Sequence, residues 1–222
     1  MPETLEFNPL ENVMPSFITP IGRFSLPGHD AFDRELASAV LRRAAQPQEL
    51  DARRGGWRSG EDILNWPEPA LAQLAGHVRS ALGHMILLAR DGEEYTGIVR
   101  LSAWARLHEA GVDWPLSHHP RSHWTALYFP AIELHPDHEG GPAGELIFQD
   151  PRGSAINMMP HPGASGAYGA LTFTPTPGLL LVFPAWLQYR LSALDNGQRI
   201  VVVGFNALLA ARGEASSPIA LA

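Results

Sequence analysis

The chain has 222 residues, a length that suits one domain with a single hydrophobic core. Hydrophobic residues make up 45% of it and charged residues 18%, which is the composition of a globular protein rather than a disordered one. The formal net charge is -7 and the 16 basic residues are scattered. This argues against a nucleic-acid partner, because binding to a phosphate backbone needs clustered lysine and arginine.

The chain contains no cysteine, which excludes disulfides and thiolate metal sites. A bound metal would therefore need histidine, carboxylate or another oxygen ligand. The N-terminal segment has neither a basic stretch nor an apolar run, and the most apolar segment, residues 176–187, is too short to span a membrane and contains Pro184. We therefore expect a cytoplasmic protein without a signal peptide or a membrane span.

Two helices are predicted in the N-terminal part of the chain. Residues 17–21 and 23–25 are predicted to form an opening pair of strands before them. Asp30 can cap a helix predicted over residues 31–45, where apolar residues recur at helical spacing. A second helix with the same periodicity is predicted over residues 70–89. We expect both helices to support a sheet rather than to form a separate domain.

From residue 96 onward the sequence is typical of a β-protein. Short apolar runs alternate with turn residues and predict strands over residues 98–107, 123–130, 145–149, 170–174, 179–183, 188–191 and 199–206. Short strands with turn signals between them indicate a sandwich, a barrel or a jelly roll. The sequence therefore predicts one domain, 1–222, with N-terminal strands and supporting helices over 1–95, a jelly-roll core over 96–212 and a loose tail over 213–222.

The histidine-rich segment Ser117-His118-His119-Pro120-Arg121-Ser122-His123 is the first candidate for chemistry. Imidazole is the commonest side-chain metal ligand at neutral pH. If the segment is a strand, His119 and His123 point to one face and His118 to the other. The alternative is a polar loop with incidental histidines.

Three further segments carry candidate groups. Residues 135–141 (HPDHEGG) could bind a metal, but they favour a solvated acidic hairpin because turn residues dominate them. Asp150 either caps a turn or lines the mouth of the barrel. Arg199 begins an otherwise apolar strand, where burial would require an anion such as a dicarboxylate. The alternative is that Arg199 lies at the exposed end of its strand.

These segments follow one another in an order that resembles a known family. Its pattern runs W-A, G, H-x-H-P, S-G-x-Y-Y, G-x-L-x-F-x-D-P-R, P-x-x-G-x-L-x-x-F-P-S-W-L-x-H and R-x-S-x-x-F-N, and an earlier G-W-x-S precedes these. The matching residues here are 56–59, 104–105, 111, 119–120, 125–129, 144–152, 177–178, 183–187 and 199–206. The combined pattern resembles the 2-oxoglutarate- and Fe(II)-dependent oxygenases, in a branch near the prolyl hydroxylases.

The resemblance implies a mainly β protein, a cupin-like double-stranded β-helix (jelly roll) buttressed by two N-terminal helices. It also implies an oxidoreductase, a dioxygenase acting on a small molecule. In such a site two histidines and one carboxylate bind Fe(II), which leaves room for 2-oxoglutarate and dioxygen. The metal candidates are His119, Asp150, His118 and His123. The candidates for binding 2-oxoglutarate are Arg199, ten residues after Tyr189, together with Tyr128, Thr125 and Trp186.

The chain departs from the family pattern at two metal positions. Ser117 stands where the family has the first histidine of H-x-H, and Tyr189 stands where it has the distal histidine, whereas His119 is kept. A serine hydroxyl is a poor iron ligand, and a tyrosine would need its pKa lowered far below about 10. Substitution by His118, His123 or Asp150 needs a slip of register, which also reverses the facing of a strand residue.

Three functions follow from these observations. The first is an oxygenase with a rearranged metal site around His119. The second is a cofactor-independent enzyme on the same scaffold, with Tyr189 or His119 as acid or base and Arg199 holding an anionic substrate. The third is a non-catalytic relative that binds a small carboxylate and has lost the iron site. Exposed strand edges in such sheets often pair, so a homodimer is a further expectation.

Overall fold

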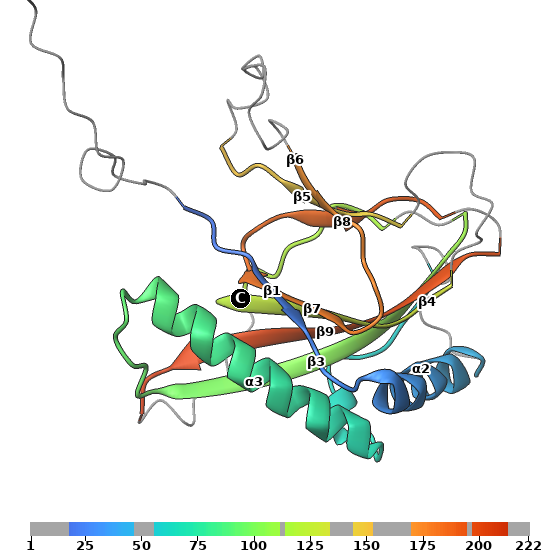
Figure 1. Cartoon of the computed structure of the whole chain (residues 1–222), viewed down its shortest axis with the longest axis horizontal. Coiled ribbons are helices and arrows are strands. Elements are labelled where there is room, and N and C mark those ends of the chain that lie inside the picture. The colour runs from blue at the N-terminus through green and yellow to red at the C-terminus, as the bar shows by residue number, and fades with distance from the viewer. Residues whose placement is uncertain are drawn as a thin grey trace, which may run out of the picture.

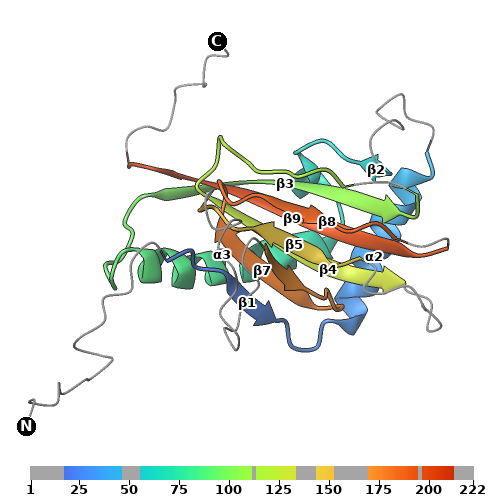
Figure 2. The ribbon, with the colours of Figure 1, turned by 90° about the horizontal axis from the view of Figure 1, so that it is seen from above.

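The structure of the protein is a computed structural model, and it describes residues 18–46, 56–111, 114–133, 144–152, 170–194 and 197–212. Over these residues two antiparallel sheets lie face to face, and helices cover the outer face of the larger sheet (Figure 1). Figure 2 shows the same arrangement from above, with β5 and β8 overlying the strands of the larger sheet. The predicted double-stranded β-helix is confirmed.

The larger sheet has the strand order β1-β7-β4-β9-β3-β2, and the smaller sheet has the order β6-β5-β8. The larger sheet contains β1 (Gly22–Ser25), β2 (Trp57–Arg58), β3 (Ile98–Glu109), β4 (Trp124–Glu133), β7 (Leu179–Pro184) and β9 (Arg199–Ala210). The smaller sheet contains β5 (Leu146–Gln149), β6 (Ala170–Phe173) and β8 (Tyr189–Leu191). Each strand predicted after residue 96 is present, with ends that differ by a few residues.

The predicted opening pair of strands is wrong. Among the described residues 18–25 only one strand, β1, forms, and it pairs with β7 at the edge of the larger sheet, from Gly22 opposite Val182 to Ser25 opposite Leu179. The two predicted segments were separated by a single residue, which is too short for a turn between antiparallel strands. The segment therefore finds its partner far along the chain.

Both predicted helices are present, as α2 (Asp30–Ala44) and α3 (Pro69–Ala89), with a short 3₁₀ helix, η1 (Ile63–Asn65), between them. Asp30 does not cap α2, because the helix begins at Asp30 itself and His29 occupies the N-cap position. Asp30 instead lies in the first turn, where the helix dipole favours an acid. Pro69 begins α3, a position at which its missing N–H costs no hydrogen bond.

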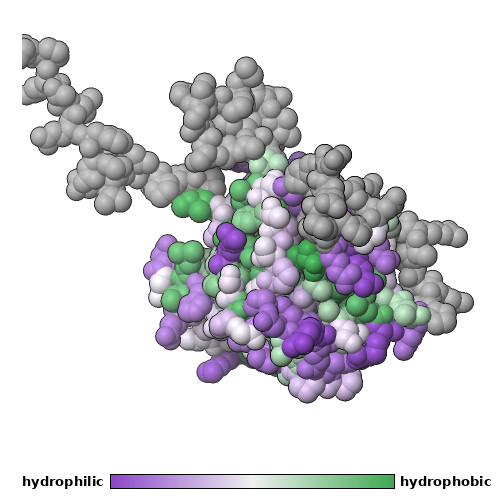
Figure 3. Space-filling view, turned by 45° about the vertical axis from the view of Figure 1, so that its right-hand side comes forward, coloured by the Kyte–Doolittle hydropathy of each residue, from purple (hydrophilic) through white to green (hydrophobic). Residues whose placement is uncertain are grey.

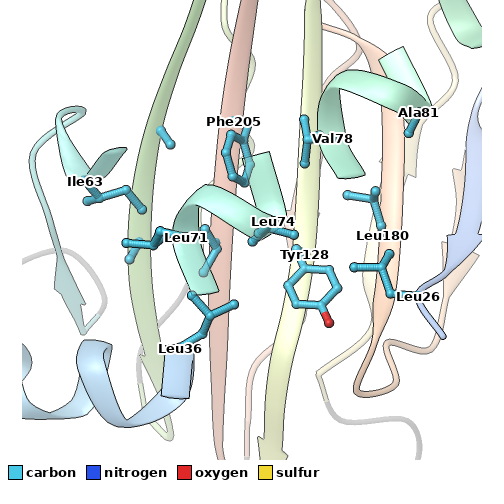
Figure 4. Close-up of a cluster of buried hydrophobic side chains, with 14 of the residues drawn as sticks. Leu26, Leu36, Ile63, Leu71, Leu74, Val78, Ala81, Tyr128, Leu180 and Phe205 are labelled. Carbon is cyan, nitrogen blue, oxygen red and sulfur yellow. The ribbon is translucent and has the colours of Figure 1, made fainter. Parts of the chain in front are cut away.

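The larger sheet buries both of its faces. One face packs against the helices in a core to which Leu36, Val78, Tyr128 and Phe205 belong (Figure 4). The other face packs against the smaller sheet, in a second core that includes aromatic side chains of β5, β7 and β8. Because successive strand residues point to opposite faces, β3, β4, β7 and β9 contribute alternate residues to the two cores.

This alternation is what positions the functional residues of β3. Ala103, Ala105 and Leu107 belong to the core beneath the helices. Trp104, Arg106 and His108 therefore face the smaller sheet, and Trp104 belongs to the second core. Within the described part of the chain, no helix is long and apolar enough to cross a membrane. Hydrophilic and apolar residues are mixed on the face that Figure 3 shows.

Candidate functional site

Residues 117, 119 and 189, the three positions where the sequence pattern predicts the family's histidines, lie together in space. Ser117 and Tyr189 form an isolated antiparallel bridge, in which the N–H of each donates to the carbonyl of the other at 2.8 and 3.0 Å. The Nε2 atom of His119 lies 3.0 Å from the Tyr189 hydroxyl. The two rings are stacked, with centroids 6.0 Å apart. Segments that are distant in the sequence thus converge on one small group of side chains.

A cavity of about 560 Å³ opens beside this group. Its walls come from the β2 segment, from the inner face of β3 and from residues 114–119. The lining contains two arginines, two tryptophans and the aligned group, namely Arg58, Arg106, Trp104, Trp114, Ser117, His119 and Tyr189. Among the described residues that line the cavity there is no carboxylate. Its walls therefore favour an anion over a cation.

Arg106 is the buried cation of this cavity. It is only 8% exposed, and its guanidinium lies 4.1 Å from the ring centroid of Trp114. Burial, together with the positive charge of Arg58, lowers the pKa of Arg106 to about 10, although Tyr189 opposes this shift. Arg106 therefore stays charged at neutral pH, and the indole face supplies some of the stabilisation that a buried cation needs.

Arg58 is the second cation, and it lies nearer to solvent. It is the direct partner of Arg106 in the β2–β3 pairing. Its guanidinium lies 5.1 Å from the ring centroid of Trp104 and 3.4 Å from the carboxylate of Glu61. Two arginines that are far apart in the sequence thus face the same cavity, each beside its own tryptophan.

Trp104 forms part of the cavity wall because β9 has a glycine opposite it. Gly204 is the register partner of Trp104, and a Cβ atom at Gly204 would lie 2.2 Å from the indole ring. Such a contact is impossible without displacing the ring. The absence of a side chain at residue 204 therefore allows the indole to lie flat on β9, where it also stacks on His119 with centroids 6.0 Å apart.

Burial keeps both members of the His119–Tyr189 pair neutral. It lowers the pKa of His119 to about 4, and the nearby charge of Arg58 acts in the same direction. Burial raises the pKa of the Tyr189 phenol above its ordinary value, although Arg106 and Arg58 oppose this. At neutral pH the site therefore offers an uncharged imidazole and a protonated phenol in hydrogen-bond contact.

These residues do not fit an iron site. Ser117 donates its hydroxyl hydrogen to the carbonyl of Pro115 at 2.8 Å, and Tyr189 is protonated and bonded to His119. His119 is thus the only imidazole at the three aligned positions. Across the part of the chain that the structure describes, no group of three histidine or acidic side chains is arranged to hold a metal ion.

Asp150 lies away from His119 and does not line the cavity. It follows β5, and its carboxylate accepts hydrogen bonds from the Arg152 guanidinium at 2.9 and 2.6 Å and from the Arg152 backbone N–H at 2.9 Å. This pairing lowers the pKa of Asp150 to about 2. It borders a separate cleft of about 270 Å³. The structure thus shows the turn-capping alternative rather than a ligand beside His119.

The histidine segment is not a strand, so the shared face of His119 and His123 that a strand would give does not arise. The N–H of Ser122 donates to the carbonyl of His119 at 3.0 Å, so the segment is a turn and alternation does not apply to it. His123 is exposed, and its Nδ1 accepts a hydrogen bond from the backbone N–H of Leu209. His118 is exposed at the rim of the cavity. Only His118 and His119 of the predicted metal candidates therefore reach the cavity.

Arg199 does not reach the cavity either. Its guanidinium donates two hydrogen bonds to the Glu133 carboxylate, at 2.6 and 3.0 Å, at the exposed end of β9. Counted back from Phe205 and Asn206, the family motif R-x-S-x-x-F-N would place its arginine at residue 200, and Ile200 is fully buried between the sheets. A shift of one residue reverses the facing of a strand side chain. The structure therefore shows the alternative in which Arg199 lies at the exposed end of its strand.

The other predicted cosubstrate contacts also lie elsewhere. Tyr128 faces the helices (Figure 4). Its hydroxyl donates to Asp33 at 2.5 Å. Thr125 is fully buried and bonded to Asn206 at 3.4 Å, and Trp186 is half exposed in the turn after β7. None of the three predicted residues lines the cavity. The predicted loop over residues 135–141 lies outside the described residues.

Sequence reasoning missed the two arginines that do line the cavity. Arg106 had a signal, because Trp104, Arg106 and His108 alternate with apolar residues in β3 and so share one face. Arg58 had a weaker one, since β2 has only two residues and was not predicted as a strand. Their pairing depends on the register between two distant segments.

The fold is shared with solved oxygenases of the 2-oxoglutarate- and Fe(II)-dependent class. A prolyl-4-hydroxylase from Pseudomonas putida superposes with a TM-score of 0.55 at 13% identity, over 85% of this chain and 92% of that one. AviO1 from Streptomyces viridochromogenes Tue57 gives 0.53 at 17% identity, over 90% and 92%. HygX from Streptomyces hygroscopicus, with nickel, 2-oxoglutarate and hygromycin B bound, gives 0.52 at 16% identity, over 85% and 83%.

These similarities are at the level of structure. No family model matches the sequence, and no curated protein matches it. At 13–17% identity the likeness shows the fold alone. What the cavity does must therefore be argued from its own side chains.

Proposed function

We propose that this protein binds a small carboxylate in the cavity between β2 and β3 and does so without iron. The observation that carries the proposal is that two arginines, Arg58 and Arg106, line one cavity beside the uncharged His119–Tyr189 pair. A carboxylate suits this position because it can accept two parallel hydrogen bonds from one guanidinium.

In this proposal the protein has the fold of the solved oxygenases but does not use a metal. HygX has been solved with nickel and 2-oxoglutarate, so a cavity on this fold can hold a metal and a dicarboxylate. In this chain Ser117 and Tyr189 replace two expected histidines. An oxygenase reaction would need further metal ligands beside His119, and the described residues around it do not supply them.

The test is a comparison of carboxylate binding with and without metal. The protein is purified without chelators, its metal content is measured by elemental analysis, and 2-oxoglutarate and succinate are titrated calorimetrically in EDTA and in anaerobic Fe(II). We expect far less than one iron per chain and the same affinity under both conditions. Stoichiometric iron, or succinate formed from 2-oxoglutarate under air, would refute the proposal.

Arg106→Gln should abolish the binding of both acids, because it removes the buried charge. Arg190→Gln is the matched control, since Arg190 follows Tyr189 directly but its side chain is exposed. The control should bind like the unmodified protein. If Arg106→Gln is folded and still binds the acids as the control does, Arg106 is not the anchor.

A second candidate function is acid–base catalysis without a cofactor. The observation that favours it is the 3.0 Å contact between His119 and the Tyr189 hydroxyl in the wall of the same cavity. The neutral imidazole can accept a proton from a carbon next to a carbonyl of the bound acid, and the protonated phenol can donate one. Such a proton transfer involves no oxidation or reduction.

This candidate can be tested by solvent exchange. The protein is incubated with 2-oxoglutarate in D₂O, and loss of the proton signal at the carbon beside the keto group is followed by NMR. Catalysed exchange that disappears in His119→Gln while binding persists would support the enzyme. If exchange is no faster than in a solution without protein, the protein does not catalyse this step and only binds the acid.

A further inference from the structure

The first residues of β3 form an open edge of the larger sheet. Residues 98–102 pair with β9 on one side. On the other side β2 pairs only with Arg106 and Leu107, and Asp62 forms a single bridge with Ala103. Within the part of the chain that the structure describes, no strand therefore lies beside residues 98–102 on that side.

The backbone groups of two β3 residues point to this open edge. In a strand, the N–H and C=O groups of alternate residues point to the same side. The Ala103 N–H points away from β9, since it donates to the Glu61 carbonyl at 3.2 Å. The backbone groups of Val99 and Leu101 therefore point away from β9 as well. Among the described residues one hydrogen bond reaches them, from the Arg79 guanidinium to the Val99 carbonyl at 3.2 Å.

A groove of about 480 Å³ lies beside this edge. It is bounded by the second half of α3, the loop after the helix and the start of β3, which lie at the same end of the molecule (Figures 1 and 2). Val99 lines the groove and packs toward the helices. Ile86 and Leu87 give the groove an apolar wall, and Leu87 is 39% exposed. A strand paired with the edge would place alternate side chains in this groove.

The last described residues of the chain lie next to the groove. Ala210 pairs with Ile98, and the hydroxyl of Tyr95, a groove residue, donates to the Ala210 carbonyl at 2.7 Å. Residues 213–222 follow with the sequence GEASSPIALA and lie outside the described residues. The chain from Ala210 to Pro218 can span roughly 26 Å, whereas the step from β9 past β3 is about 10 Å, or two strand spacings. Residues 218–222 can therefore reach the edge.

Residues 218–222 also have the alternation that an added strand needs. Ile219 and Leu221 are large and apolar, whereas Ala220 and Ala222 are small. Successive residues of a strand point to opposite faces, so the two large side chains share one face. With that face toward α3, both meet the apolar wall of the groove.

The same residues match the hydrogen-bonding groups of the edge. A segment that passes the start of β3 and turns along its edge runs parallel to β3. In a parallel pair with Ile219 beside Val99, the Val99 backbone groups bond to the residues before and after Ile219. The Val99 N–H donates to the Pro218 carbonyl, and the Val99 carbonyl accepts from the Ala220 N–H. Proline has no N–H, and this register requires only its carbonyl.

We infer that residues 218–222 add a parallel strand to the open edge of β3 within the same chain. Ile219 lies beside Val99, and the side chains of Ile219 and Leu221 enter the groove beside α3. This strand closes an edge that could otherwise pair with a second copy of the chain. A homodimer would then need another surface.

Hydrogen exchange followed by NMR tests the pairing in the full chain. The variant Ile219→Asp with Leu221→Asp places two charges against an apolar wall and should release the segment. The Val99 and Leu101 amides should then exchange at least about tenfold faster than in the unmodified chain. The Arg100 amide is the internal control, because it points to β9 and should exchange at the same rate in both chains.

Two matched pairs of variants assign the effect to the groove. Ala220→Asp with Ala222→Asp adds the same charge at the alternate positions, which face away from the groove, and should keep the slow exchange. Leu87→Asp should speed the exchange of both β3 amides. Leu88→Asp should not, because Leu88 is 63% exposed and does not line the groove.

A synthetic peptide with the sequence of residues 213–222 tests the same contact between molecules. It should bind the variant Ile219→Asp with Leu221→Asp at least about tenfold more tightly than the unmodified chain, whose own segment competes at high effective concentration. Equal exchange rates in all chains, or equal peptide binding, would overturn the inference. If slow exchange occurs only in a dimer, as judged by sedimentation, the segment pairs with a second copy and the assignment within one chain is wrong. Thermal unfolding checks that each variant is folded.

Discussion

Replacing Tyr128 by phenylalanine should weaken the attachment of α2 to the larger sheet. Tyr128 is fully buried on β4, and its hydroxyl donates to the Asp33 carboxylate at 2.5 Å. Asp33 is itself 4% exposed on α2, and its second oxygen lies 2.6 Å from the Nδ1 atom of His29. The substitution removes one of the two hydrogen-bond partners of a buried acid and almost no volume.

The expected cost follows from the kind of bond that is lost. A hydrogen bond to a charged group contributes about 1.5–3 kcal/mol, so Tyr128→Phe should lower the free energy of unfolding by about 2 kcal/mol. Phenylalanine keeps the aromatic ring, so the contact with Phe32, at a centroid separation of 5.5 Å, is unaffected. A cavity term is negligible because only an oxygen atom is removed.

The cost should also depend on pH. Burial raises the pKa of Asp33 above 3.8, and the hydrogen bonds from Tyr128 and His29 lower it in part. A carboxyl whose pKa is higher in the folded chain contributes its stability below the unfolded value and loses it as the pH rises through the folded value. Removing the phenol raises that pKa further. The cost of Tyr128→Phe should therefore be larger at about pH 8 than at about pH 4.

Urea unfolding of the wild type and the variant at both pH values measures this difference. Tyr95→Phe is the matched control, because the Tyr95 hydroxyl donates to the uncharged carbonyl of Ala210 at 2.7 Å. Its cost should be about 1 kcal/mol and independent of pH. If Tyr128→Phe costs no more than the control at either pH, the buried carboxylate does not carry the interaction described here.

Three further predictions concern the cavity. Gly204→Ala should displace the Trp104 indole, lower the free energy of unfolding by about 1–3 kcal/mol and change the tryptophan emission spectrum; an unchanged spectrum and stability would contradict the packing. Because the pKa of His119 is lowered to about 4, the folded chain binds a proton at this histidine less readily than the unfolded chain does. Acidification from pH 7 to 4 should therefore lower the free energy of unfolding by up to about 3 kcal/mol. Urea unfolding across that range should show that His119→Gln does not have this loss. The double variant Ser117→His with Tyr189→His should bind Ni(II) in a calorimetric titration where the unmodified protein does not; no gain would mean that these positions cannot form a metal site.

The strands could be predicted from the sequence because their signals are local. Alternating apolar residues and turn residues mark each strand after residue 96 without reference to any partner. The meeting of Ser117, His119 and Tyr189 was accessible only through the family pattern, since β8 and the histidine segment are far apart in the chain. Function was less accessible, because it depends on which face each residue occupies.

The facing of a residue depends on register, and register depends on partners that a sequence does not display. Arg199 lies one residue before the buried position that Ile200 occupies, and that single step turns a predicted cosubstrate clamp into a surface ion pair with Glu133. Arg58 acquires its role only because a two-residue strand pairs it with Arg106. Neither relation could be obtained from spacing alone.

The positive charge of the cavity and the absence of histidines at residues 117 and 189 both disfavour a bound metal cation. Arg58 and Arg106 both lie close enough to Tyr189 to oppose the rise in its pKa, so their positive charges act at the position where the sequence pattern predicts the distal metal ligand. A divalent cation placed there would be repelled by two guanidinium groups, in surroundings where charges are poorly screened. A carboxylate at the same place would be attracted by both. Restoring histidines at residues 117 and 189 should therefore give only weak Ni(II) binding, and adding Arg106→Gln to that variant should strengthen it. If removing the Arg106 charge leaves the Ni(II) affinity unchanged, the arginines do not determine which sign of ligand the cavity accepts.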